Sequence, residues 1–305
     1  MVRFSRREPP SSALSILPYH RRHRQAIRDL LFRHENTHVH LDWQETDTWL
    51  DGEEGVTRLA FMGAHLIGVL AFSEPLGGTC WIRIASFHDT HDPVPLLAAL
   101  WLDAAAALRA TGVTLVALLL LRDWIGTLVA PLGFAPREDI ITLRRAAAHA
   151  GTGYSEGDAP PVLPDMTPDG ITLRSVVPED IDAIIAIDHR AFAPPWQMTP
   201  REIRQAQRIS AYSTVAERDR RVVGYQICTV YFDGAHLARL AVDPAVQRLG
   251  VGAALVSGGI RHFARRGIGI MTVNTQASNT RSQRLYERVG FRRNGYDLPV
   301  WTVGL

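Results

Sequence analysis

Residues 237–244 read Leu-Ala-Arg-Leu-Ala-Val-Asp-Pro, a short apolar run of strand formers that ends at an Asp-Pro pair. Residues 247–252 follow as Gln-Arg-Leu-Gly-Val-Gly, and a helical pattern of apolar residues then covers 255–263. A strand, a glycine turn and a helix in this order leave N–H groups unpaired at the positive helix end, where phosphate can bind. Gly250 and Gly252 lack the Cβ atoms that would hold a diphosphate off the backbone. The stretch predicts a phosphate-binding turn, although a turn with glycines for steric reasons alone has the same pattern.

The sequence downstream carries two further motifs at fixed separations. A second strand is expected at residues 268–273, and residues 279–291 read Asn-Thr-Arg-Ser-Gln-Arg-Leu-Tyr-Glu-Arg-Val-Gly-Phe. Together with the Gln-Arg-x-Gly-x-Gly turn, these motifs resemble the GNAT superfamily of acetyl-CoA-dependent N-acetyltransferases. Residues 235–291 most resemble the ribosomal-protein alanine N-acetyltransferases, and a looser match reaches back to residue 171. The length and layout of the whole chain resemble those of the mycothiol synthases.

The resemblance implies acetyl-CoA as the acetyl donor. It implies that residues 240–242 diverge from their parallel neighbour, residues 270–273, and that the N–H of Val242 bonds the thioester carbonyl. A donor aimed at a developing oxyanion is worth about 3–4 kcal/mol. Asn279 would bond the pantetheine arm, or would simply cap the helix that follows it. The cofactor-binding residues implied are Leu240, Ala241, Val242, Gln247, Arg248, Leu249, Gly250, Val251, Gly252, Ala253, Asn279, Ser282 and Tyr286.

The resemblance assigns catalysis to Tyr286 together with Val242. A phenol with an ordinary pKa of about 10 is protonated at neutral pH and can protonate the departing thiolate. The alternative for Tyr286 is a half-buried ring that packs beside Leu285 and Phe291.

The expected general base is missing. The alanine N-acetyltransferases carry a glutamate five residues before the Asn279 position, where this chain has Asn274. An asparagine can orient a water molecule but does not usefully accept a proton. The proton would then pass to a water chain or to Asp188, His189 or His236, unless the amine arrives neutral. Asn274 is therefore kept as a substrate-binding candidate. The missing glutamate weakens the inference of peptide N-terminal acetylation more than the inference of acetyl transfer in general.

The acceptor side is expected between two helices, one starting near Pro178 and one at Thr199. By the resemblance, the loop between them lines the acceptor site. Phe192 and Trp196 could form its wall and Asp188 could meet an ammonium group. The alternative is that both aromatic rings close the core under the loop.

Three blocks of sequence recur at a spacing of 156 or 157 residues. One block is residues 81–85, Trp-Ile-Arg-Ile-Ala, which matches residues 237–241, and another is Leu-Gly-Phe at 132–134, which matches 289–291. The repeat predicts an α/β chain with two copies of one unit. The resemblance implies that these are two tandem GNAT folds, each a mixed, mostly antiparallel twisted sheet flanked by helices. The predicted domains are residues 1–148 and 170–305, and residues 149–169, rich in Gly, Pro, Ser and Asp, read as a linker.

The two copies are not chemically equivalent. The first has residues 91–96, His-Asp-Pro-Val-Pro-Leu, at the position of the glycine turn, and its two prolines remove N–H donors. It has Val129 in place of Tyr286 and Arg122 in place of Asn279. We therefore expect a degenerate first domain that supports a catalytic second one.

Composition limits the possible partners. The net charge is +2, which gives no reason to expect nucleic acid, and the longest apolar run, 113–121, is too short to cross a membrane. Two cysteines and no signal-peptide pattern favour the cytoplasm. Histidines at 34, 38 and 40 and at 88 and 91 are interpreted as solvated surface, so no metal site is predicted.

Three functions remain open. The favoured one is direct acetyl transfer, in a ternary complex, to the primary amine of a small molecule. The second is acetylation of protein or peptide N-termini, as in the ribosomal type. The third is an acyl-CoA-binding module without catalysis, which the presence of Tyr286 argues against.

Overall fold

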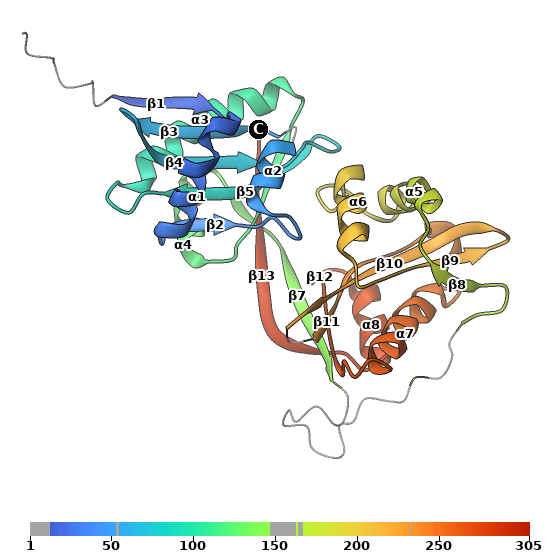
Figure 1. The fold of residues 1–305 in the computed structure, drawn as a ribbon. Coiled ribbons are helices and arrows are strands. Elements are labelled where there is room, and N and C mark those ends of the chain that lie inside the picture. The colour runs from blue at the N-terminus through green and yellow to red at the C-terminus, as the bar shows by residue number, and fades with distance from the viewer. Residues whose placement is uncertain (1–12, 53–54, 147–162, 164–166, 233) are drawn as a thin grey trace, which may run out of the picture. The chain divides into compact units, whose positions relative to one another are not determined.

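The computed structural model describes residues 13–52, 55–146, 163, 167–232 and 234–305. The chain divides into two compact units, one formed by Met1–Pro136 with Trp301–Leu305 and the other by Arg137–Val300. Each unit is a mixed, mostly antiparallel sheet with helices packed on it, as the sequence predicts (Figure 1).

The first unit has the strand order β1-β3-β4-β5-β6, with β2 paired to β5. Among its described strands, β1 with β3, β3 with β4, β4 with β5 and β2 with β5 are antiparallel, and β5 with β6 is parallel. The elements are β1 (Leu14–Pro18), η1 (Arg21–His23), α1 (Arg24–Arg33), β2 (Thr37–Val39), α2 (Thr46–Gly52), β3 (Thr57–Met62), β4 (His65–Phe72), β5 (Thr79–Phe87), α3 (Pro93–Ala110), β6 (Leu115–Leu119), α4 (Asp123–Val129) and η2 (Ala130–Leu132).

The second unit repeats this pattern with the order β7-β12-β11-β10-β9-β8. Its one parallel pair among the described strands is β11 with β12. The elements are β7 (Ala135–Ala146), β8 (Thr172–Ser175), η4 (Pro178–Asp180), α5 (Ile181–Ala191), α6 (Pro200–Ile209), β9 (Tyr212–Arg218), β10 (Arg221–Tyr231), β11 (Gly234–Val242), η5 (Pro244–Val246), α7 (Val251–Ala264), β12 (Ile270–Gln276), α8 (Thr280–Arg288) and β13 (Arg292–Gly304).

The helices of the second unit lie on both faces of its sheet (Figure 1). On one face, α7 and α8 bury an apolar core that includes Val256, Phe263 and Phe291. On the other face, α5 covers β10 and β11, where its Asp188 accepts a hydrogen bond from Tyr225 of β10 at 2.6 Å. This second face is covered only in part, since Asn274 on β12 is exposed.

The strands β11 and β12 diverge, as predicted. Their parallel register runs only from Ala235↔Met271 to Leu237↔Val273, whereas β11 continues to Val242. Beyond Leu237 the edges of the two strands separate and form a fork, which leaves backbone groups of β11 without a partner on β12.

Local sequence signals mark several helices correctly. Thr199 accepts a hydrogen bond from the N–H of Glu202 at 3.1 Å, and Glu202 accepts one from the N–H of Thr199 at 2.8 Å. This capping box starts α6 where Thr-Pro-Arg-Glu predicted a start. The longest apolar run, residues 113–121, contains the strand β6.

In the described part of the chain, only α3 is long and apolar enough to span a membrane by length and composition. Its Leu97, Leu100 and Leu108 are buried in the core of the first unit. A core helix passes the same length and hydropathy test.

The unit boundaries differ from the predicted domains at both ends. β7 pairs with β12 from Ile270↔Ala146 to Gln276↔Ile140, so residues 137–146 belong to the second unit. Trp301–Leu305 belong to the first unit, where the N–H of Leu305 donates to Thr114 O at 3.0 Å. A sequence repeat identifies equivalent strands but not the sheet that each one completes, so it missed this exchange. The predicted linker lies outside the described residues except for 163 and 167–169.

Candidate functional site

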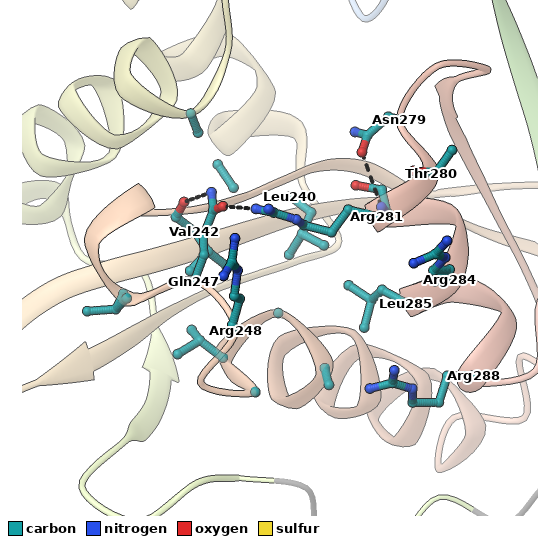
Figure 2. A pocket seen from close by; sticks show the side chains of 18 of the residues that line it. Leu240, Val242, Gln247, Arg248, Asn279, Thr280, Arg281, Arg284, Leu285 and Arg288 are labelled. Atoms are coloured by element: carbon teal, nitrogen blue, oxygen red, sulfur yellow. Dashed lines mark hydrogen bonds between the residues drawn. The ribbon is translucent and has the colours of Figure 1, made fainter.

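A cavity of about 840 Å³ opens in the second unit at the C-terminal end of β11. Its volume is in the usual range for a small-molecule pocket. The lining comes from β11, from the turn that precedes α7, from the start of α7 and from α8 (Figure 2). Ala191 at the end of α5 and Phe192 after it complete the lining. The predicted cofactor residues that line it are Leu240, Ala241, Val242, Gln247, Arg248, Gly250, Val251, Gly252, Ala253, Asn279 and Ser282.

The glycine turn has the geometry of an anion site. Gly250 has a φ of 85°, a left-handed conformation that side chains disfavour, and it caps α7. The first intrahelical bond runs from Ala254 N to Gly250 O, so the N–H groups of residues 251–253 have no acceptor within the helix. A Cβ added at Gly252 would lie 3.3 Å from Leu285 and 3.7 Å from Val242, both of which line the cavity.

The cavity is cationic. Arg248, Arg281, Arg284 and Arg288 line it, and none of the described residues that line it is acidic (Figure 2). Guanidinium groups and a helix N-terminus attract the same ligand, a phosphate-rich anion.

Asn279 both caps α8 and lines the cavity. Its Oδ1 accepts a hydrogen bond from Ser282 N at 3.1 Å, which caps α8, and the residue also lines the cavity. Across the cavity, Gln247 donates to Val242 O at 3.0 Å and accepts from Arg281 (Figure 2). A chain of side chains therefore links the end of β11 to the start of α8.

The structure does not place Tyr286 or Leu249 on the cavity. Leu249 is 50% exposed and lies beside the turn. Tyr286 is 4% exposed, and its ring centroid lies 5.8 Å from that of Phe291. Its ring belongs to the apolar cluster that holds Leu237 and Val273, the last paired residues before the fork. Burial raises the pKa of Tyr286, with a smaller contribution from Cys228 and an opposing one from Arg239.

Asp188 is buried in a polar cluster and does not reach the cavity. It has no exposed surface, and its carboxylate accepts from Tyr225 at 2.6 Å, from Arg239 Nε at 2.7 Å and from Met198 N at 3.0 Å. Burial alone would lower the pKa of Arg239, but Asp188 beside it raises that pKa. The carboxylate that was expected to meet an ammonium group is thus occupied by a guanidinium.

Arg239 is the residue that sequence reasoning missed. Its Nη2 donates to Trp196 O at 2.7 Å, and its guanidinium lies 3.7 Å from the centroid of the Phe192 ring. Phe192 lines the cavity, whereas Trp196 does not. The signal was present in the repeat, because Arg239 and Arg83 occupy the same place in their blocks.

The candidate bases occupy different environments. Asn274 is exposed on β12, one residue beyond the last pair before the fork. His236 lies on the same face, with Nδ1 2.8 Å from Thr272 Oγ1. His189 Nε2 is 2.9 Å from Met198 O and must donate to that carbonyl. Of the named candidates, His236 and Asn274 are those beside the fork.

The first unit lacks the same donors. Asp92 accepts from Val94 N at 3.0 Å at the start of α3, and Pro93 and Pro95 have no N–H. The first turn of α3 therefore offers little to an anion. It keeps an arginine–aspartate ion pair, because the buried Arg83 donates to Asp42 at 3.0 Å, although Asp42 itself is exposed.

The histidines of the first unit are not all solvated, contrary to the prediction. His38 is 1% exposed, and burial lowers its pKa to about 4. His34 and His88 have ring centroids 4.1 Å apart. Among the described residues, no three His, Cys, Asp or Glu side chains are arranged to hold a metal ion.

Comparisons with known proteins agree with this geometry. Residues 181–291 match the acetyltransferase (GNAT) family. The chain is 32% identical over 133 residues to the ribosomal protein bS18-alanine N-acetyltransferase of Haemophilus ducreyi, a match that covers 42% of this chain and 90% of that protein.

Two other similar proteins match different shares of this chain and of their own length. The mycothiol acetyltransferase of Thermomonospora curvata is 34% identical over 146 residues, 45% of this chain and 49% of that protein, so the match spans about half of that relative. The structure of a tandem GNAT protein from the clavulanic acid biosynthesis pathway superposes with a TM-score of 0.63 at 14% identity and covers 96% of this chain and 98% of that one. This last likeness shows a shared tandem fold. The chain belongs to the GNAT family of acetyltransferases.

Proposed function

We propose that this chain is an acetyl-CoA-dependent N-acetyltransferase that acetylates the primary amine of a small molecule. The observation that carries the proposal is the arginine-lined cavity, which joins the glycine turn to the fork between β11 and β12. Acetyl-CoA, which GNAT acetyltransferases use in general, supplies an acetyl thioester.

The lining residues fit that ligand. The N–H groups of residues 251–253 suit its diphosphate, and the absence of a Cβ at Gly252 leaves space beside them. The four arginines suit its remaining negative charge. Asn279 and Ser282 are proposed to hold the pantetheine arm.

Two residues are assigned to the chemistry. The Val242 N–H would stabilise the charge that develops on the carbonyl oxygen. Tyr286 would protonate the leaving thiolate, which requires its hydroxyl to reach the fork from the cluster that holds Leu237 and Val273. Its raised pKa keeps the phenol protonated at neutral pH.

The route of transfer is proposed to be direct, without an acyl-enzyme. A cysteine nucleophile would need to be exposed as its thiolate. Cys80 and Cys228 are both buried. Burial raises the pKa of Cys80 to about 12 and raises that of Cys228 further. The amine is therefore expected to attack while both substrates are bound, which gives intersecting rather than parallel lines in initial-velocity plots.

A second candidate is acetylation of peptide N-termini. The match to the ribosomal protein bS18-alanine N-acetyltransferase covers 90% of that protein and favours it. The side chain of Asn274 disfavours it, since it replaces the glutamate expected there by resemblance.

The first unit is proposed to bind no cofactor and to support the second. Its helix α3 begins with a capped N–H and two prolines, and Val129 replaces the tyrosine. Calorimetric titration with CoA should then give one site per chain. A stoichiometry of two would contradict this role.

The decisive experiment measures free thiol released from acetyl-CoA. A panel of small primary amines is compared with peptides that begin with alanine or serine. Release with amines alone supports the proposal, and release with peptides alone supports the second candidate. CoA binding without release in either set would leave only a binding module.

A further inference from the structure

Only one face of the fork is open. On the other face, Leu237 and Val273 belong to the buried core that also holds Tyr286 and Phe291. An amine must therefore approach from the opposite face of β11 and β12, the face that carries His236 and Thr272, whose Nδ1 and Oγ1 atoms are 2.8 Å apart.

β7 extends this open face. Along β7, Ile141 and Leu143 point into the core, so the alternating residues Thr142 and Arg144 point to the other face. The register sets Arg144 opposite Thr272 and Thr142 opposite Asn274. Directly opposite residues of an antiparallel pair share a face. A strand from the first copy of the repeat thus supplies two side chains beside the fork of the second unit.

The open face is polar, and Arg144 is a cation on it. Arg144 is half-buried, and its guanidinium makes no hydrogen bond or ion pair with the described part of the chain. The nearest carboxylate in the same alternation on β7 is Glu138, and it accepts from Ser278 N at 3.2 Å. An incoming anion therefore meets Arg144 without a competing carboxylate from its own strand.

The geometry of the sheet gives the distance between Arg144 and the fork, and so the length of acceptor that could span it. Neighbouring strands lie about 4.8 Å apart, and residues i and i+2 of a strand about 6.7 Å apart. The Cα of Arg144 is one strand and one such step away from that of Asn274, which is roughly 8 Å. An arginine side chain can reach back over part of this distance.

We infer that Arg144 binds an anionic group of the acceptor, so that the acceptor is a small amine carrying a carboxylate or phosphate a few bonds from its nitrogen. This inference rests on the proposed acetyltransferase function and adds a substrate class to it. A guanidinium group binds a carboxylate or a phosphate through two parallel N–H donors. A neutral amide or hydroxyl in the place of that anion cannot form the same charged, paired interaction.

The test compares amines that differ only in the anion. One pair is 4-aminobutanoate and 4-aminobutanamide, and the other is O-phosphoethanolamine and ethanolamine. The wild-type protein should favour the anionic member of at least one pair in kcat/KM. The pair that shows the preference identifies the anion as a carboxylate or a phosphate.

Arg144→Gln should lower kcat/KM for the anionic amine about 10- to 100-fold and leave the neutral amine within about twofold. Arg144→Lys should keep part of the preference, because the charge remains. Arg137→Gln changes an exposed arginine on the same strand and should leave kcat/KM unchanged for both amines.

Failure of this inference is distinct from failure of the proposed function. Turnover with equal losses for both amines in Arg144→Gln, or a wild-type preference for the neutral amines, overturns the role of Arg144 and leaves acetyl transfer intact. If no amine turns over, calorimetric titration of the CoA complex with each pair still decides, because Arg144→Gln must weaken binding of the anionic amine alone.

Discussion

The guanidinium of Arg239 lies 3.7 Å from the centroid of the Phe192 ring, so a buried cation of β11 supports an aromatic wall of the cavity. The same guanidinium donates to Asp188 within α5 and to the carbonyl of Trp196 in the loop before α6. One side chain therefore attaches the end of α5 and the following loop to the strand that leads into the fork. We interpret Arg239 as a positioning residue for the acceptor side.

Replacing Arg239 with methionine should destabilise the second unit and weaken acceptor binding. Removing one partner of a buried ion pair costs about 3–5 kcal/mol, because Asp188 is left buried and uncompensated. The loop at Phe192 loses its anchor, so the KM for the amine should rise more than kcat falls. Urea unfolding and steady-state kinetics measure the two effects.

Arg83 provides the control, because it occupies the place of Arg239 in the repeat and forms an ion pair with the more exposed Asp42 in the first unit. Arg83→Met should also reduce the free energy of unfolding but leave the amine KM unchanged. Equal rises in KM for both variants would show that lost stability, rather than the position of Phe192, explains the effect.

Gly252→Ala should weaken CoA binding. The added Cβ would lie 3.3 Å from Leu285 and 3.7 Å from Val242, within the cavity lining and beside the N–H groups of the first helical turn. We expect a loss of affinity on the order of tenfold, or about 1.4 kcal/mol, by calorimetric titration. Gly258→Ala is the control on the same helix, since its Cβ meets Leu173 at 3.4 Å, away from the cavity. Unchanged affinity in Gly252→Ala would place the ligand elsewhere.

Tyr286→Phe tests the general acid. Loss of the acid should lower kcat about 10²–10⁴-fold and leave CoA affinity unchanged. Because burial raises the pKa of the phenol, it should remain protonated through neutral pH and give no alkaline fall in rate below about pH 10. A variant that turns over as fast as the wild-type protein would reduce Tyr286 to a packing residue.

The parts of the molecule that depend on neighbouring residues were predicted well from the sequence. The glycine turn, the start of α7 and the cap at Asn279 each follow from a few adjacent residues. The fork followed from the resemblance, and the register of β11 with β12 confirms it.

The parts that depend on distant residues were predicted poorly. Asp188 and Arg239 are 51 positions apart, and nothing local marks them as partners. The exchange of β7 and the end of β13 is decided by strand pairing across the two copies, which a repeat cannot assign. Tyr286 was placed on the cavity by motif, whereas the packing of α8 turns its ring into the core.

His38 predicts an acid-sensitive first unit. Burial, aided by the charges of His40 and Arg83, lowers its pKa from 6.5 to about 4, so the folded unit excludes a proton that the unfolded chain binds below pH 6.5. The neutral His38 therefore costs no stability above pH 6.5. As the pH falls toward 4, protonation of the unfolded chain lowers the free energy of unfolding by roughly 3 kcal/mol. Urea unfolding at a series of pH values should show this loss in the wild-type protein and a smaller one in His38→Leu. Substitution of the exposed His65 by leucine is the control and should leave the pH dependence unchanged. An equally steep loss in His38→Leu would assign the acid sensitivity to other groups.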